Sequence, residues 1–305
     1  MIDQTRGATR GEPAMTLTAL LRRRALPSSP AALVDQAPAD AHNLTDVGKK
    51  TYFLVYGRDA LFCFDGSSLA TVPQAPAGIT RIVAVGSDLY LTAESDRYPG
   101  LTSIHRYRNS RFTFIATTEA SQLLLTSFRG RAYFRLQSGL WYVNGCDLVP
   151  VAGSPIDILA LTVFGQELYI VHHDSEMCAI SSYRGSSFTR LDGVPADGPF
   201  EFAALDEALY IRTRRHVYVW ARSTFSLASS GRFTGLAAYN GVLYAKAYGT
   251  SKLGVLDRTG FSELANTPPL SGEINIVRGG LYFLDRAGRL HTHRTAAPPL
   301  RASID

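Results

Sequence analysis

The sequence predicts an all-β protein built from seven similar repeats. A short signature recurs along its 305 residues, in which a tyrosine is flanked on both sides by apolar or small residues. The seven tyrosines are Tyr52, Tyr90, Tyr133, Tyr169, Tyr210, Tyr244 and Tyr282. Successive tyrosines lie 38, 43, 36, 41, 34 and 38 residues apart. A period of about 20 to 50 residues is typical of repeat architectures.

A second signature runs in phase with the first. In six repeats an apolar or aromatic residue is followed, five positions later, by Phe or Leu. The six pairs are Phe64 and Leu69, Tyr107 and Phe112, Val143 and Leu148, Tyr183 and Phe188, Trp220 and Phe225, and Leu256 and Phe261. The residues between them include turn formers such as Asn144-Gly145. This is the chemistry of a tight hairpin, so the pattern predicts a β-hairpin in each repeat.

Each repeat holds four short apolar stretches. In the second repeat they span residues 79–85, 89–93, 103–107 and 112–117. They are rich in β-branched and aromatic residues and too short for helices. Four antiparallel strands in about 40 residues make one blade of a β-propeller. We therefore expect a single seven-bladed β-propeller of four-stranded antiparallel blades. A two-sheet sandwich would instead show strict in-and-out alternation and no fixed period.

The two ends of the repeat array predict how the ring closes. The seventh repeat has three strands and then runs into Thr295-Ala-Ala-Pro-Pro299 without a fourth. Residues 31–38 are similar in sequence to residues 69–76, which form the fourth strand and exit loop of the first repeat. We expect an N-terminal strand near Leu33 to supply the outer strand of the last blade, which removes an unpaired edge. The predicted boundaries are a flexible N-terminal tail at 1–30, the propeller at 31–294 and a C-terminal tail at 295–305.

The repeats resemble the β-propeller superclass, and within it degenerate kelch-like and WD-like blades, over roughly residues 31–294. The resemblance to kelch lies in the stretches NGVLYA (Asn240–Ala245) and RGGLYF (Arg278–Phe283). The sequence departs from the kelch pattern in two ways: only Gly279-Gly280 gives a double glycine, and Leu or Phe replaces the expected tryptophan. It departs from the WD pattern because no Trp-Asp dipeptide occurs. The resemblance implies a fold and no particular activity, because propellers carry many functions.

Composition argues against several functional classes. The net charge is +5, and the 27 arginines and 4 lysines are scattered along the chain. A nucleic-acid partner is not expected, since such proteins gather basic residues on one stripe. No apolar run reaches the roughly 18 residues of a membrane-spanning helix, so no membrane partner is expected. Three cysteines outside any CxxC motif predict neither a disulfide framework nor structural zinc, and we expect them to be packed or unreactive. No catalytic motif, cofactor or metal is predicted.

Candidate binding residues lie in the loops between second and third strands, which share one face of a propeller with the blade-to-blade loops. Arginine suits carboxylate and phosphate recognition, and several basic residues cluster in these loops. The candidates for ligand or partner binding are Arg97, Arg135, His172, Asp174, Arg212, Arg214, Arg215, Lys246, Lys252 and Arg286. Adjacent residues on a strand point to opposite faces, so one of His172 and His173 is expected to be packed. The alternative is a solvated rim whose charges are balanced by loop acids such as Asp285.

The sequence favours a non-catalytic scaffold propeller that binds a protein partner through its loops. One alternative is a carbohydrate-binding, lectin-like propeller, and an acidic or glycan ligand is a further candidate. A second alternative is a central-channel hydrolase or lyase using a pair of loop acids. The acids considered are Asp59, Glu94, Asp96, Asp174, Glu176 and Asp285. We expect a monomer in the cytoplasm; the alternatives are export by a non-Sec route, as for a bacterial effector, and organelle targeting through the N-terminal tail.

Overall fold

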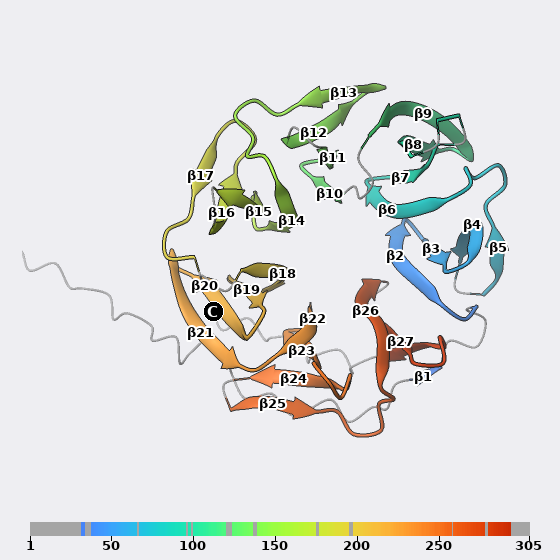
Figure 1. Ribbon diagram of the computed structural model, residues 1–305. Coiled ribbons are helices and arrows are strands. Elements are labelled where there is room, and N and C mark those ends of the chain that lie inside the picture. Colours follow the sequence, from blue (N-terminus) through green and yellow to red (C-terminus); the bar gives the residue numbers. More distant parts are fainter. Residues whose placement is uncertain are drawn as a thin grey trace, which may run out of the picture.

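The computed structural model describes residues 32–33, 38–65, 67–95, 97–98, 100–119, 124–136, 139–174, 177–194, 198–257, 259–277 and 280–293. These residues form seven four-stranded antiparallel sheets that stand as blades in a ring (Figure 1). The predicted seven-bladed β-propeller is therefore confirmed. The described residues contain strands and no helix, so no helix among them could cross a membrane.

The first and second strands form the inner part of each blade. The first strands, which face the centre in Figure 1, are β2 (Ala41–Val47), β6 (Ile79–Val85), β10 (Leu125–Phe128), β14 (Ile158–Phe164), β18 (Pro199–Leu205), β22 (Phe233–Tyr239) and β26 (Leu270–Val277). The second strands are β3 (Lys50–Val55), β7 (Asp88–Glu94), β11 (Arg131–Leu136), β15 (Glu167–Asp174), β19 (Ala208–Thr213), β23 (Val242–Ala247) and β27 (Gly280–Asp285). Each second strand carries one of the seven repeated tyrosines, as predicted.

The third and fourth strands complete each blade toward its outer edge. The third strands are β4 (Arg58–Phe64), β8 (Thr102–Arg108), β12 (Gly139–Asn144), β16 (Met177–Tyr183), β20 (His216–Ala221), β24 (Leu253–Asp257) and β28 (Leu290–His293). The fourth strands are β5 (Leu69–Thr71), β9 (Arg111–Thr118), β13 (Asp147–Pro150), β17 (Phe188–Arg190), β21 (Thr224–Ser230), β25 (Gly260–Glu263) and, for the last blade, β1 (Ala32–Leu33).

The hairpins between third and fourth strands have the predicted register. All six sequence pairs separated by five residues are direct cross-strand partners. In three of them the rings are in contact: the centroids of Tyr107 and Phe112, of Tyr183 and Phe188, and of Trp220 and Phe225 are each 4.6 Å apart. The second sequence signature is therefore an apolar cross-strand pair beside the turn of six outer hairpins, a pair of the kind that stabilises sheets.

The ring closes through the N-terminal strand. Strand β1 pairs antiparallel with β28, and Ala32 and Leu33 are the partners of Thr292 and His291. The last blade thus takes three strands from the end of the chain and one from its beginning, as expected for a strand near Leu33. The predicted tails, residues 1–30 and 295–305, lie outside the described residues.

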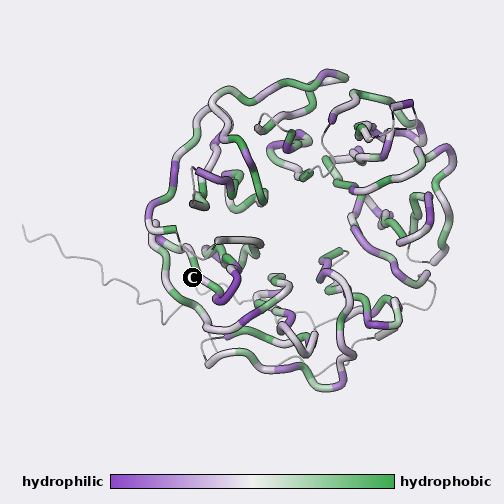
Figure 2. The backbone as a smooth tube through the Cα atoms, viewed as in Figure 1, coloured by the Kyte–Doolittle hydropathy of each residue, from purple (hydrophilic) through white to green (hydrophobic). Residues whose placement is uncertain are grey.

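The hydrophobic core lies between the blades. Seven clusters of buried side chains occur, one at each interface between neighbouring blades. The cluster at the closure, for example, joins Phe53 and Phe62 of the first blade to Leu284 of the last. Hydrophobic segments accordingly run through every blade (Figure 2). The second strands are apolar on both faces because each is covered by a blade on either side, and all seven repeated tyrosines are buried.

Candidate binding face

The second-to-third strand connections and the blade-to-blade connections lie at the same end of the ring, because the strands within each blade are antiparallel. We call this end the loop face. In five blades a main-chain hydrogen bond joins the end of the second strand, or the connection directly after it, to the blade-to-blade connection. The donor and acceptor pairs are Tyr56 N to Asp40 O (3.2 Å), Glu94 N to Gly78 O (2.9 Å), His173 N to Asp157 O (3.2 Å), Tyr248 N to Arg232 O (2.9 Å) and Arg286 N to Pro269 O (3.2 Å). Each acceptor directly precedes a first strand, so the bond recurs with the blade.

The donors of these bonds belong to one set of equivalent positions. Each lies four residues after the repeated tyrosine of its blade. In the six blades where this position is described, its residue is exposed. These six, which we call the loop-face ring, are Tyr56, Glu94, His173, Arg214, Tyr248 and Arg286. At five of the six positions the main chain carries the recurrent hydrogen bond, and at all six the exposed side chain is available for contacts outside the protein. Arg214 and Arg286 were predicted from the sequence as binding residues, and Glu94 was considered only as a catalytic acid; the fixed offset from the tyrosine could have revealed all six as one set.

Three exposed tyrosines on the loop face are held by a ring or guanidinium contact. Tyr56 stacks on His42 with ring centroids 3.7 Å apart and an interplanar angle of 11°. The guanidinium carbon of Arg232 lies 3.9 Å from the ring centroid of Tyr248, and that of Arg97 lies 5.4 Å from the centroid of Tyr98. Exposed cation–π contacts of this kind are worth about 0.5–1 kcal/mol, enough to favour one orientation of the ring.

Large exposed apolar side chains are concentrated on this face. Eight are exposed in the described part of the chain. Five of them belong to loop-face connections or to the adjoining start of a first strand: Tyr56, Tyr98, Ile156, Leu159 and Tyr248. Leu159 projects from a β-bulge between Ile158 and Ala160, and such bulges re-aim side chains. The loop face therefore combines apolar surface with arginine.

The candidates predicted from the sequence divide into an exposed group and a strand group. Arg97, Arg214, Arg215 and Arg286 are exposed in loop-face connections, as expected. Lys252 is half-buried in such a connection, and its Nζ donates a hydrogen bond to the carbonyl oxygen of Thr267 at 3.2 Å. The four arginines are available for contacts with other molecules. Lys252 is less available, because its ammonium group already donates a hydrogen bond within the protein.

The other five candidates lie in strands, and their expected position in loops was wrong. Strands β11, β15, β19 and β23 continue through the polar residues that were taken as the start of each loop. His172 is buried, with Nε2 3.0 Å from the hydroxyl of Ser181, whereas His173 is exposed, so the prediction that one histidine is packed is confirmed. Asp174 forms an ion pair with Arg190.

The remaining three strand candidates occupy a single equivalent position, two residues after the repeated tyrosine. In the other four blades this position is buried and holds Leu54, Thr92, Val171 and Leu284. Arg135, Arg212 and Lys246 are therefore cations at a site that is otherwise mostly apolar. Arg212 donates from Nε to Glu201 Oε2 at 2.8 Å and from Nη1 to the carbonyl oxygen of Phe233 at 3.0 Å. Burial raises the pKa of Glu201 despite the opposing charge of Arg212.

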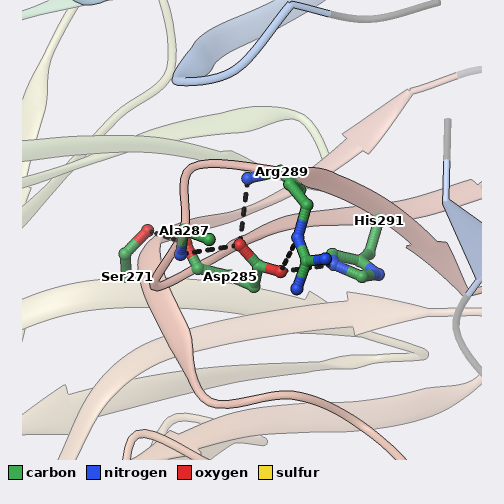
Figure 3. A network of polar contacts seen from close by, with 5 residues as sticks. All are labelled: Ser271, Asp285, Ala287, Arg289 and His291. Atoms are coloured by element: carbon green, nitrogen blue, oxygen red, sulfur yellow. Dashed lines mark hydrogen bonds and ion pairs between the residues drawn. The ribbon is translucent and has the colours of Figure 1, made fainter. Parts of the chain in front are cut away.

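Asp285 was expected to be a loop acid available to solvent or substrate, and this expectation was wrong. Its side chain is buried at the end of β27 and accepts four hydrogen bonds (Figure 3). Oδ1 accepts from the main-chain nitrogens of Ala287 (2.8 Å) and Arg289 (2.9 Å), and Oδ2 from Arg289 Nε (2.8 Å) and His291 Nε2 (3.0 Å). Burial alone would raise the pKa of Asp285, but the hydrogen bonds from His291 and Arg289 outweigh it and lower the pKa to about 2. Asp285 is therefore ionised, and its hydrogen bonds stabilise the turn between β27 and β28.

The other potential reactive groups are dispersed. Asp59 and Glu94 are exposed, whereas Asp96 and Glu176 lie outside the described residues. Across the described ranges, no three His, Cys, Asp or Glu side chains are grouped so that they could hold a metal ion. Cys63 and Cys178 are half-buried, whereas Cys146 is exposed in the β12–β13 turn; Cys146 is therefore not packed, and its expected lack of reactivity remains a prediction.

Comparison with known proteins supports the fold and leaves the family open. No protein-family model matches the chain, and no curated protein matches it in sequence. Many solved structures are similar. Virginiamycin B lyase from Staphylococcus aureus is 12% identical with a TM-score of 0.62, covering 86% of this chain and 97% of the lyase. BamB from Moraxella catarrhalis is 12% identical with a TM-score of 0.56, covering 89% of this chain and 84% of BamB.

A third similar structure is larger than this chain. PorZ from Porphyromonas gingivalis, an essential bacterial surface component of the type-IX secretion system, is 13% identical with a TM-score of 0.58. The match covers 88% of this chain and 39% of PorZ. These likenesses show a shared propeller fold. No kelch or WD family is identified, and the fold alone does not specify a function.

Proposed function

We propose that this propeller is a non-catalytic binding protein that holds a protein partner against its loop face. The observation that carries the proposal is that five of the eight large exposed apolar side chains of the described residues lie on that face. Tyrosine and arginine are enriched among the residues that dominate binding energy at protein interfaces, and here they occur as contacting pairs.

Pre-ordering of these side chains supports the proposal. The contacts of Tyr56 with His42 and of Tyr248 with Arg232 hold each ring in place before any partner arrives. Side chains that are already ordered lose less conformational entropy on binding, so more of the contact energy contributes to affinity. A solvent-exposed rim of unrestrained side chains would not give this advantage.

The surroundings of the candidate acids argue for binding over catalysis. Asp285 is committed to four hydrogen bonds and Asp174 to Arg190. Glycoside hydrolysis needs two carboxyl groups facing each other across the substrate, and neither of these acids is available for such a pair. The fold itself is compatible with both roles, since one similar structure is a lyase and another is a component of a secretion system.

Site-specific photo-cross-linking in cells tests the proposal. A benzophenone amino acid replaces Tyr56 or Tyr248 on the loop face, and Ser87 in the β6–β7 turn serves as the matched exposed site at the opposite end of the ring. We expect the same discrete protein adduct from both loop-face sites and none from Ser87. The adduct should disappear when Arg214→Glu and Arg215→Glu are combined with the probe, because both arginines are exposed on the same face.

Two results would contradict the proposal. One is an adduct that forms only from Ser87, which would move the binding surface to the other end of the ring. The other is the absence of any protein adduct together with glycan-array binding that Tyr56→Ala and Tyr248→Ala abolish. That outcome would favour the carbohydrate-binding alternative.

A further inference from the structure

Main-chain hydrogen bonds join the loop-face connections of the fifth, sixth and seventh blades into one continuous series. These blades follow one another around the ring (Figure 1). The donor and acceptor pairs, in order, are Gly231 N to Arg215 O (3.0 Å), Tyr248 N to Arg232 O (2.9 Å), Leu270 N to Ser251 O (2.8 Å) and Arg286 N to Pro269 O (3.2 Å). Residues 231–232 and 269–270, which link one blade to the next, are each bonded to the loops on both sides. The main chain therefore fixes five successive connections relative to one another.

The charges in this series have a single sign. The five connections are residues 214–215, 231–232, 248–252, 264–269 and 286–289, and they contain six cations and no acid. The cations are Arg214, Arg215, Arg232, Lys252, Arg286 and Arg289. In the described part of the loop-face connections between β7 and β18, the charged residues are instead Arg97, Glu119, Asp157 and Asp192. Basic residues that are scattered along the sequence are thus gathered on one side of the loop face.

Four of these cations, which we call the basic arc, are exposed and without a carboxylate partner. They are Arg214, Arg215, Arg232 and Arg286. In the part of the chain that the structure describes, none of the four forms an ion pair, whereas Arg289 is paired with Asp285. The exposed acids of the neighbouring strands, Glu263 on β25 and Glu273 on β26, form no ion pair with the arc either.

A basic arc of this kind is suited to a ligand that carries several carboxylates. Like charges held close together repel one another, and an anion of matching shape removes that repulsion. Each guanidinium can donate two parallel hydrogen bonds to one carboxylate. Tyr248 lies within the series, with its ring 3.9 Å from the guanidinium carbon of Arg232, and adds apolar contact area between the charges.

We propose that the basic arc binds an extended acidic segment of a protein partner. This inference rests on the proposed loop-face function and specifies the chemistry of the partner. An extended segment suits the site because the arc spans the connections of three blades, so that successive acidic side chains can meet successive arginines. The backbone hydrogen bonds order the connections before binding, which lowers the entropic cost of association.

Two observations favour a protein segment over a nucleic acid. The acids Glu119, Asp157 and Asp192 are exposed in the connections of the other blades, and they would repel a long polyanion that continued across the face. Single-stranded nucleic acids also bind on several aromatic side chains in succession, whereas the five connections of the series contain one aromatic residue, Tyr248. A protein partner can present acidic groups to one side of the face and basic groups to the other.

Fluorescence polarisation with a synthetic acidic peptide tests the inference. The probe is a fluorescein-labelled peptide of six Gly-Glu repeats, and a peptide of six Gly-Gln repeats and an oligothymidylate of equal charge are separate arms. We expect saturable binding of the Glu peptide, no binding of the Gln peptide and weaker binding of the oligothymidylate. Affinity for the Glu peptide should fall between 50 and 300 mM sodium chloride, because salt screens exposed charges.

Two double variants with the same change in net charge separate the arc from a general charge effect. Arg214→Glu with Arg286→Glu reverses both ends of the arc and should weaken the apparent affinity for the Glu peptide about tenfold. Lys49→Glu with Arg111→Glu reverses two exposed cations at the opposite end of the ring and should leave the affinity unchanged. All four side chains are exposed, so both variants should keep the melting temperature of the native protein, and Arg214→Gln with Arg286→Gln is the milder replacement if one does not.

The outcomes distinguish this inference from the proposed function. Equal weakening in the two double variants, or equal binding of the Glu and Gln peptides, would overturn the basic arc as a site. Tighter binding of the oligothymidylate that depends on the arc would overturn a protein segment as the occupant and favour a nucleic acid. Loop-face cross-links without Glu-peptide binding would leave the proposed function standing and contradict this inference. Arc-dependent Glu-peptide binding without any cross-linked protein would support the acidic-ligand site and contradict the loop-face protein partner.

Discussion

The two ends of the ring are built from different chemistry. At the end opposite the loop face, which we call the turn face, tight hairpin turns join first to second and third to fourth strands. Asn240-Gly241, with φ angles of 49° and 67°, shows how residue type is dictated there by backbone conformation. On the loop face the recurrent main-chain hydrogen bonds fix the backbone, so the side chains of the loop-face ring are not restricted in this way. The contrast therefore concerns the six ring positions, because other loop-face residues, such as Asp40 and Asp157 with φ angles of 63° and 52°, also adopt left-handed backbone conformations.

The largest expected effect on stability comes from removing the Asp285 carboxylate, which stabilises the β27–β28 turn on the loop face. Asp285→Ala removes the acceptor of four hydrogen bonds, two of them from charged or chargeable groups, Arg289 and His291. We expect the free energy of unfolding to fall by about 2–3 kcal/mol, the cost of losing hydrogen bonds to a charged group. Urea denaturation measures it. Asp65→Ala, in the exposed β4–β5 turn of the turn face, is the matched change and should cost much less.

A backbone change on the turn face should have an intermediate effect. Gly241→Val places a β-branched residue at a φ of 67°, a left-handed conformation that costs non-glycine residues about 1–2 kcal/mol. Thermal unfolding should show this loss while cross-linking from Tyr248 persists. Thr234→Val, at the exposed bulge of β22, is the control and should leave stability unchanged. Loss of cross-linking in a folded Gly241→Val protein would show that the two ends are coupled.

Acid should weaken the loop face before it unfolds the rest of the protein. The pKa of Asp285 is lowered from 3.8 to about 2, so its folded-state contribution is complete above pH 4. That contribution is lost as the pH falls toward 2, because the folded protein must then take up the proton that the unfolded chain already binds. Denaturation at pH 5, 4, 3 and 2 should show a steeper fall for the native protein than for Asp285→Asn. Parallel pH profiles would argue against this role of Asp285.

The smallest effect on stability is expected for the exposed tyrosines. Tyr56→Ala and Tyr248→Ala each remove one surface contact, worth about 0.5–1 kcal/mol at an exposed site. The melting temperature should therefore change little, while cross-linking from Tyr98 should be lost if the loop face binds. A large drop in melting temperature would mean that these rings support the fold and would remove the basis for a separate binding surface.

The periodic parts of the fold could be predicted from the sequence because they repeat. A cross-strand pair such as Tyr183 with Phe188 needs two apolar residues at a fixed spacing, and the strand near Leu33 is similar in sequence to another fourth strand. The ends of the second strands could not be predicted in the same way. Arg212 and Lys246 are polar, and polarity suggests a loop, but their hydrogen bonds to Glu201 and Gly272 keep them within the sheet.

The candidate site was predicted only in outline for the same reason. Exposure of Arg214 and Arg286 follows from their place after a strand, whereas burial of Asp285 depends on Arg289 and His291 converging on it in three dimensions. Cys146 differs from the usual pattern for its residue type. A cysteine is usually packed, but this one is exposed in a two-residue hairpin turn.

The pairing of β1 with β28 also has a consequence for synthesis of the protein. The strand at Ala32–Leu33 leaves the ribosome before every other described strand, and its partner at Leu290–His293 leaves after all of them. Six blades contain only neighbouring stretches of sequence and can assemble as they emerge. The seventh cannot be completed until Leu290–His293 has been translated. A truncated product therefore keeps an open blade edge, a feature that promotes aggregation and that quality-control proteases can act on.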